Sequence, residues 1–286
     1  MNTFGAVLGS FSAGFVFIPI LGITWTIYFA ALLNLSICAG MLKLAQIRLQ
    51  WEPSESTEKS RKKKRKKKSV QEVVSESWGP IQSVVMVGIG ISGIAALIYQ
   101  IAWTRVLSLS IVSSVYAFSL IVTAFICGLA LVSLVIAKFI DRRRDLVMWL
   151  ALRQGAVGLS ALGIVQVLGN LPIFVTQFVN KASHSRKKIQ LTEFANIFGL
   201  ILVPTIMMGS TVPIALKICT TDVRRVGRFF FIVSAVNSIG AYIGSFMAGF
   251  ILIPWLGTLN CILIAVALNI FLAVVLFLWA PTLVVP

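Results

Sequence analysis

The sequence predicts an all-α fold, a polytopic membrane helical bundle of about eight transmembrane helices. Of the 286 residues, 58% are hydrophobic and 12% are charged, and the mean hydropathy is +0.95. Soluble domains carry about a quarter charged residues, and a bilayer crossing takes about 20 apolar residues as helix. The apolar runs are too long and alternate too little for strands of a membrane barrel. The expected helices are 3–21, 24–43, 82–102, 114–137, 147–169, 192–215, 229–253 and 258–279.

The first and the last helix pairs repeat each other. Asn2–Gly22 aligns with Asn237–Gly257 without a gap at a constant offset of 235, and 13 of the 21 positions are identical. Such internal repetition marks a repeated structural unit. We therefore expect 1–43 to be a two-helix remnant of a preceding repeat and 81–286 to be a six-helix membrane domain, so that the chain is truncated.

A basic linker separates these two parts. The net charge is +16, and nine of the cations lie in Lys59–Lys68. Residues 44–80 are too polar to bury a core, which predicts disorder. Because the linker lies between membrane helices, we expect it to bind anionic lipids of the cytoplasmic leaflet. Nuclear localisation or nucleic-acid binding is the less favoured alternative, and we expect no nucleic-acid partner.

Charge in the short loops predicts the orientation in the inner (plasma) membrane. With the linker cytoplasmic, the basic loops Lys138–Asp145 and Lys217–Arg228 fall on the same side, in agreement with the positive-inside rule. The loop Asn180–Lys188 carries four cations and falls on the opposite side, which disagrees with it. Three basic segments against one favour a multi-pass topology with a cytoplasmic linker.

Glycine pairs predict close helix packing. Gly5 with Gly9, and Gly240 with Gly244, form G-x-x-x-G within the repeat, a spacing that puts both glycines on one helix face. This motif indicates a helix interface and says nothing about chemistry.

A second glycine motif matches the sequence pattern of a dinucleotide-binding loop but lacks the surrounding elements that such a loop needs. Gly88, Gly90 and Gly93 fit G-x-G-x-x-G, but they lie inside an apolar helix, and no carboxylate follows until Asp141. The dinucleotide fingerprint needs a preceding strand and an acidic residue about 20 positions on. These glycines are therefore interpreted as helix-packing residues.

Polar side chains within the apolar runs are the candidate pathway or coupling residues, because such groups are costly in a bilayer and usually functional. They are Tyr99, Gln100, Arg105 and Gln154, with Glu193 near the outer mouth. For Arg105 the alternative is that it reaches the membrane interface.

Metal and cofactor sites are not expected. His184 lies alone in a loop, and no two cysteines have C-x-x-C spacing. The cysteines are interpreted as small apolar residues.

The segment "KFIDRRRD" resembles the signature that joins the second and third helices of major facilitator superfamily (MFS) transporters, G-x-L-x-D-R-x-x-R. Asp141 and Arg142 match it, whereas the leading glycine is absent. Asp141 can pair with neighbouring arginines and helix ends, which predicts a cytoplasmic latch between two helices. Ordinary positive-inside charge is an alternative that explains the arginines but not Asp141.

Four segments carry a further resemblance: Gly90–Leu109, Ser113–Leu134, Met207–Leu216 and Val226–Gly257. Together they resemble the membrane portion of bacterial proteins in which an MFS-like bundle is fused to a spermidine-synthase-like domain. The resemblance covers about residues 84–280, with Asn2–Asn34 as part of the preceding repeat.

This resemblance implies an MFS-like six-helix domain in 81–286 that moves a small solute or polyamine, or docks a separately encoded synthase-like domain. Because the chain stops at Pro286, we expect no synthase domain and no enzymatic activity. Gln100 and Gln154 stand where the family often carries Glu, and an amide cannot ionise, so carboxylate-dependent coupling is not expected. The alternative is a non-catalytic membrane anchor or degenerate remnant without transport. A homodimer through the glycine faces stays open.

Overall fold

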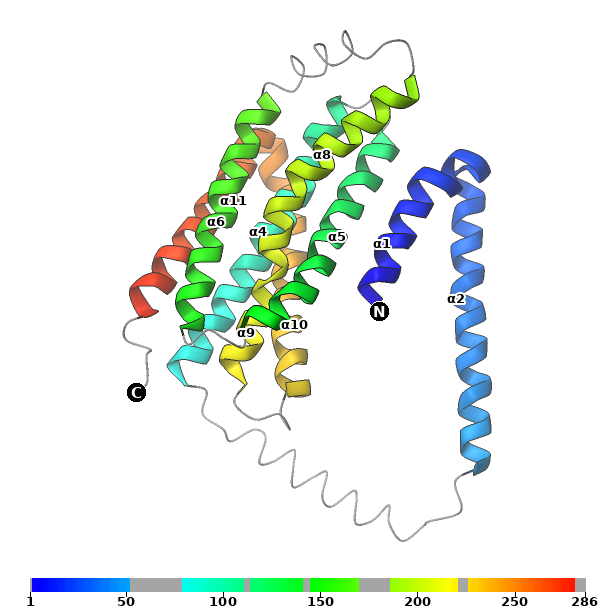
Figure 1. Cartoon of the computed structure of the whole chain (residues 1–286), viewed down its shortest axis with the longest axis horizontal. Helices are drawn as coiled ribbons and strands as arrows, with labels where there is room; N and C mark the ends of the chain where they lie inside the picture. Colours follow the sequence, from blue (N-terminus) through cyan, green and yellow to red (C-terminus); the bar gives the residue numbers. More distant parts are fainter. Residues whose placement is uncertain are drawn as a thin grey trace. The chain divides into compact units, whose positions relative to one another are not determined.

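The computed structural model describes residues 2–51, 79–110, 114–140, 145–169, 186–220 and 226–280. Every regular element within these ranges is helical (Figure 1). The elements are α1 (Asn2–Ser12), the π-helix η1 (Ala13–Phe17), α2 (Ile18–Trp51), α4 (Pro80–Ser110), α5 (Ser114–Ile140), α6 (Leu146–Gly169), α8 (Arg186–Gly209), α9 (Thr211–Cys219), α10 (Val226–Phe246), the π-helix η3 (Met247–Leu252) and α11 (Ile253–Trp279).

Contacts divide the chain into two units. One unit joins Met1–Phe15 to Pro80–Pro286, and the other is Val16–Gly79, which contains α2. The first unit therefore holds α1 together with all helices from α4 onward. The expected domain limits at 43/44 and 80/81 stay a prediction, since most of 44–80 lies outside the described residues.

The described helices make this chain an integral membrane protein by length and composition. Five stretches are long and apolar enough to cross a bilayer, and Ile121–Val132 is a shorter apolar stretch. Two of the five exceed a single crossing, which needs about 20 residues. The predicted membrane helical bundle is confirmed at this level, whereas the count of eight crossings stays a prediction. The five are Phe4–Gln46, Pro80–Ser108, Leu146–Val167, Phe198–Cys219 and Val226–Trp279.

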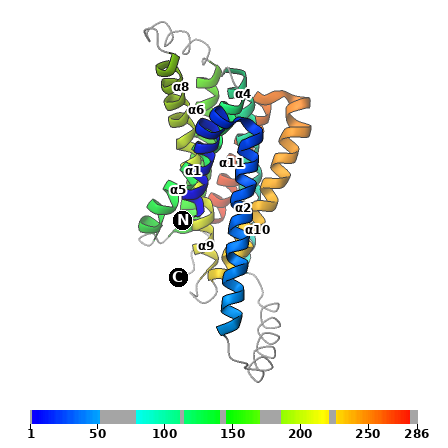
Figure 2. The ribbon, with the colours of Figure 1, turned by 90° about the vertical axis from the view of Figure 1, so that its right-hand side faces the viewer.

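The first unit is a bundle in which α4 packs against α10 and α11, α11 also packs against α6, and α5 packs against α8 and α1. In Figure 2 α10 rises to a sharp turn and α11 runs back from it. Two apolar clusters fill the bundle. One lies around Tyr99 and Trp103, and the other lies around Ile89 and Leu276.

The sequence repeat is also a structural repeat. The π-helices η1 and η3 occupy matching positions in the two copies. Both copies then turn at a glycine, Gly22 with φ 77° and ψ 169°, and Gly257 with φ 82° and ψ 166°. Residues with a Cβ rarely adopt this conformation. The kink inside α2 and the kink inside α11 are therefore each set by the glycine that the two copies share.

One expected helix is broken in the structure. The segment 192–215 divides into α8 and α9 at Ser210, whose backbone N–H donates to the Met207 carbonyl at 3.2 Å. Pro213 follows in the first turn of α9. Because proline has no N–H, it cannot complete the helical hydrogen bond to Gly209, and α8 ends there.

Candidate functional site

Tyr99, expected from the sequence, lies at the centre of the larger apolar cluster. It is fully buried on α4 and stacks on Trp103, with ring centroids 5.1 Å apart and an interplanar angle of 22°. The amide Nδ2 of Asn269 on α11 donates a hydrogen bond of 3.2 Å to the Tyr99 hydroxyl oxygen. This hydrogen bond links two helices whose residues are 170 positions apart.

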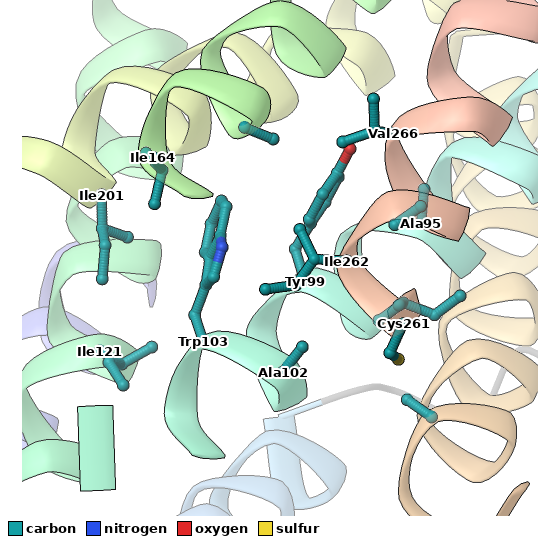
Figure 3. Packing of buried hydrophobic residues seen from close by; sticks show 14 of the residues in the cluster. Ala95, Tyr99, Ala102, Trp103, Ile121, Ile164, Ile201, Cys261, Ile262 and Val266 are labelled. Carbon is teal, nitrogen blue, oxygen red and sulfur yellow. The ribbon is translucent and has the colours of Figure 1, made fainter. Parts of the chain in front are cut away.

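Trp103 brings an unpaired donor into the same cluster. Its side chain is 0% exposed, and its Nε1 has no hydrogen-bond acceptor among the described residues. Figure 3 shows Trp103 and Tyr99 standing side by side, with Ile121, Ile164 and Ile201 on the side of Trp103. Since an indole N–H can only donate, this atom needs an acceptor that the described part of the protein does not supply.

Gln154, also expected from the sequence, is 2% exposed on α6. Its Nε2 has no acceptor in the described ranges. It lies between residues that enter the two apolar clusters, Ala151 on one side and Val157 on the other. One turn further along α6, Gly158 faces α11 at Asn269, where an added Cβ would lie 3.7 Å from the Asn269 Cβ. We call Tyr99, Trp103, Gln154 and Asn269 the buried polar set, in which the ring stack and the Asn269 hydrogen bond join Tyr99 to two of the others, while Gln154 is buried on α6.

The other polar candidates do not join this set. Gln100 is half-buried, and its backbone carbonyl accepts a hydrogen bond from the Thr104 hydroxyl at 2.6 Å. Arg105 is exposed on α4, which fits the interface alternative. The latch residues Asp141 and Arg142 lie outside the described residues. The cytoplasmic latch therefore stays a prediction.

Glycines bring the backbones of α4 and α10 together. A Cβ added at Gly240 would collide with the carbonyl oxygen of Gly90, and one added at Gly244 would collide with that of Ile94. Side chains larger than hydrogen cannot fit at either position without moving a helix. This contact is what G-x-x-x-G pairs provide in membranes.

The remaining glycine candidates differ in their surroundings. A Cβ at Gly93 would collide with the backbone of α10, and one at Gly88 would lie 3.1 Å from the Leu272 side chain of α11. For Gly5 and Gly9 on α1, in contrast, no atom of the described residues lies within 4 Å of an added Cβ. The same motif is therefore engaged in one copy of the repeat and open in the other.

Sequence reasoning missed Trp103 and Asn269 as site residues. In the sequence Trp103 looks like an ordinary apolar residue, and only its burial in the structure shows that its N–H group lacks an acceptor among the described residues. For Asn269 a signal exists, because the repeat extends at the same offset of 235 to pair it with Asn34. An asparagine kept at matching positions in two apolar helices indicates a structural or functional role.

Within the described ranges, no three or more His, Cys, Asp or Glu side chains lie close enough to hold a metal ion. Cys38 is exposed, Cys219 and Cys261 are buried, and all described cysteines are free. Comparison of the whole chain with protein-family models, curated proteins and solved structures gave no match.

Proposed function

We propose that this integral membrane protein is the membrane part of a small-solute carrier. The buried polar set carries the proposal. Polar side chains inside a membrane bundle are expensive and usually mark a solute or ion pathway. A buried donor without an acceptor costs about 1–3 kcal/mol. Trp103 and Gln154 both have this cost in the described structure, and a bound solute that accepts hydrogen bonds would offset it.

The side chains define the chemistry of the solute. The Trp103 N–H and the Gln154 amide N–H groups offer donors, so the solute must present acceptors such as a carbonyl, carboxylate or hydroxyl oxygen. The stacked rings of Tyr99 and Trp103 offer flat faces that attract an apolar or cationic part. A polyamine, which the family resemblance implies, would use the ring faces but not the donors. An acceptor-rich zwitterion or neutral solute would use both.

Access to this set requires movement of helices. Tyr99 and Trp103 are fully buried, so a solute reaches them only when the helices around them separate. Secondary carriers achieve this by rocking helical bundles around a site near the bilayer midplane. The amide of Gln154 replaces the carboxylate that the resembling family often carries, so solute movement without proton coupling is part of the proposal.

Transport by the full chain in proteoliposomes tests the proposal. Uptake of labelled spermidine and of a panel of labelled amino acids is compared with uptake by empty vesicles. Trp103→Phe removes the indole N–H but keeps a ring, and Gln154→Leu removes the amide; each should reduce uptake at least tenfold. Asn260→Leu is the matched control, because Asn260 is exposed on α11 and its amide bonds only to the Leu256 carbonyl of its own helix.

The outcomes distinguish a solute carrier from a membrane anchor without transport. Uptake above empty vesicles that falls in both core variants and persists in Asn260→Leu supports a carrier. If every tested solute enters at the rate of empty vesicles, the carrier proposal is rejected, and the anchor alternative is favoured. Uptake of spermidine in particular would support transport of polyamines. Docking of a synthase-like partner is a separate role that the resemblance implies.

A further inference from the structure

Arg153 is the only charged residue in the sequence of α6. The stretch Leu146–Val167 of this helix is long and apolar enough to cross a bilayer, and Arg153 lies seven positions after its first residue. Charged side chains within membrane spans are rare and costly, and they usually pair with another polar group or mark a binding site or pathway. The guanidinium of Arg153 therefore needs an anionic partner.

The described residues do not supply this anion. The Arg153 side chain is half-buried, and no carboxylate of the described ranges lies within ion-pair distance of it. Asp145, the carboxylate nearest in sequence, is exposed, and its backbone carbonyl accepts a hydrogen bond from the Trp149 N–H at 3.1 Å. Its carboxylate makes no ion pair with Arg153 in the described structure.

Trp149 fixes the position of the charge. The guanidinium carbon of Arg153 lies over the Trp149 ring, 5.9 Å from the ring centroid, and cation–π contacts extend to about 6 Å. Side chains on a helix lean toward its N-terminus, so residues four positions apart meet in this way. The contact thus draws the charge of Arg153 toward the start of α6.

The length of α6 places this pair near the edge of the bilayer. Its 24 residues rise about 36 Å, whereas the hydrocarbon core is about 30 Å thick. Trp149 lies about 5 Å from the start of the helix, close to the boundary between hydrocarbon and headgroups. Tryptophan rings and the heads of long cationic side chains are both typical of this boundary.

The neighbours of Arg153 on α6 show which side of the helix carries the charge. Leu152 is exposed and Gln154 is buried, so Arg153 lies where the lipid-facing side of α6 meets its packed side. The larger apolar cluster contacts α6 from Val157 onward. A solute that stacks on the rings of that cluster would therefore lie deeper in the membrane than the Arg153 guanidinium.

We propose that Arg153 and Trp149 bind the phosphate of one anionic phospholipid at the start of α6. The planar guanidinium can donate two parallel N–H hydrogen bonds to phosphate oxygens, and the Trp149 ring holds it in place. The exposed Leu152 provides an apolar contact for an acyl chain. An anionic lipid compensates the charge of Arg153, whereas a zwitterionic lipid brings a cation of its own.

This lipid site differs from the predicted attraction of lipids by the basic linker. The cations of Lys59–Lys68 attract anionic lipids as a group, whereas Arg153 and Trp149 form one defined place on a helix. The basic loop Lys138–Asp145 precedes α6, so the predicted topology puts the site in the cytoplasmic leaflet, where anionic lipids are concentrated. The inference goes beyond the proposed transport and does not depend on it.

Photolabelling with a lipid probe tests the inference. Phosphatidylglycerol with a diazirine in its acyl chain, close to the glycerol, is mixed into phosphatidylcholine nanodiscs that contain the full chain. Irradiation and peptide mapping then report the labelled residues. We expect labelling of α6 around Leu152, and we expect Arg153→Gln to reduce it at least tenfold. Arg153→Lys keeps the charge but loses the planar fork, so its labelling should lie between these two values.

Lys43→Gln is the matched control, because it removes the same charge from an exposed position on α2. Its labelling of α6 should equal that of the unmodified chain. Excess unlabelled phosphatidylglycerol should compete with the probe, whereas phosphatidylcholine should not. Thermal unfolding in a mild detergent checks that Arg153→Gln is folded, and added phosphatidylglycerol should raise the Tm of the unmodified chain more than that of this variant.

Three results would overturn the inference. Equal labelling of α6 in Arg153→Gln and in the unmodified chain would show that Arg153 does not hold the lipid. Competition by phosphatidylcholine as strong as that by phosphatidylglycerol would show that the site does not select an anionic lipid. Loss of labelling in excess inorganic phosphate, but not in chloride of the same ionic strength, would make soluble phosphate the ligand.

Discussion

Asn269 and Tyr99 form a hydrogen bond between two predominantly apolar helices. The bond joins α11 to α4, and its geometry is satisfied only when the two helices keep one relative position along their axes. Hydrogen bonds between membrane helices contribute about 0.6–2 kcal/mol each. The amide and hydroxyl thus fix the register of the helix pair, while apolar packing supplies most of the contact.

Removal of either partner should destabilise the bundle. We expect Asn269→Leu and Tyr99→Phe each to lower the free energy of unfolding by about 1–3 kcal/mol, because each leaves a buried polar group unpaired or breaks the bond. The double variant should lose less than the sum of the two. The free energy of unfolding of each variant is measured by adding a denaturing detergent to the chain in a mild detergent, with Asn260→Leu as the control. Losses in the double variant that equal the sum of the two single losses would argue against the hydrogen bond.

At the scale of helices, identical glycines have different surroundings. Gly244→Leu should lower the free energy of unfolding by about 1–3 kcal/mol or prevent folding, since overpacked contacts carry that cost. Gly9→Leu, its counterpart in the repeat, should leave the stability of the isolated chain unchanged. Thermal unfolding in detergent compares the two. Equal destabilisation of both variants would contradict the difference in their surroundings.

The turn near the start of α11 depends on the positive φ of Gly257. We expect Gly257→Ala to destabilise the chain by about 1–3 kcal/mol, because a residue with a Cβ is strained in this conformation. Gly163→Ala, in the middle of α6, should instead stabilise the chain by about 1 kcal/mol through helix propensity. Thermal unfolding followed by circular dichroism shows which variant is destabilised and which is stabilised. If Gly257→Ala leaves the stability unchanged, the turn tolerates a Cβ.

At the scale of the whole molecule, apolar side chains cover much of the described surface. Trp255 is 82% exposed and Phe231 is 73% exposed. Soluble proteins rarely expose an apolar surface of this kind to water. We expect the chain to stay in the membrane pellet after alkaline carbonate and high-salt washes and to enter solution only in detergent. Release by carbonate would contradict an integral membrane protein.

The orientation of the chain in the membrane is a second prediction for the whole molecule. A cysteine introduced at Ser60 in the basic linker, in a chain with its native cysteines replaced, should react with a membrane-impermeant maleimide only from the cytoplasmic side. The cations of Lys59–Lys68 are expected to keep this segment there. Labelling of intact cells from outside would reverse the topology.

The helical membrane class could be predicted from the sequence because a bilayer permits few backbone conformations. Tyr99 and Gln154 could be found because polar side chains are conspicuous in apolar runs. Asn269 could not be assigned its role, since the role depends on how α11 packs against α4, a contact between distant parts of the chain. The break at Ser210 depends on a proline three residues later, a local signal that the hydropathy of 192–215 obscures.

The contact between Gly90 and Gly240 has a consequence for biosynthesis. Gly240 follows Gly90 by 150 residues, and a ribosome adds about 5–20 residues per second. For about 8–30 s the nascent α4 therefore displays its glycine face in the translocation machinery or the bilayer before α10 has been made. During this interval α1, already synthesised, is the described helix that carries the same G-x-x-x-G pair. The final bundle is reached only when the newly made α10 takes this face in preference to α1.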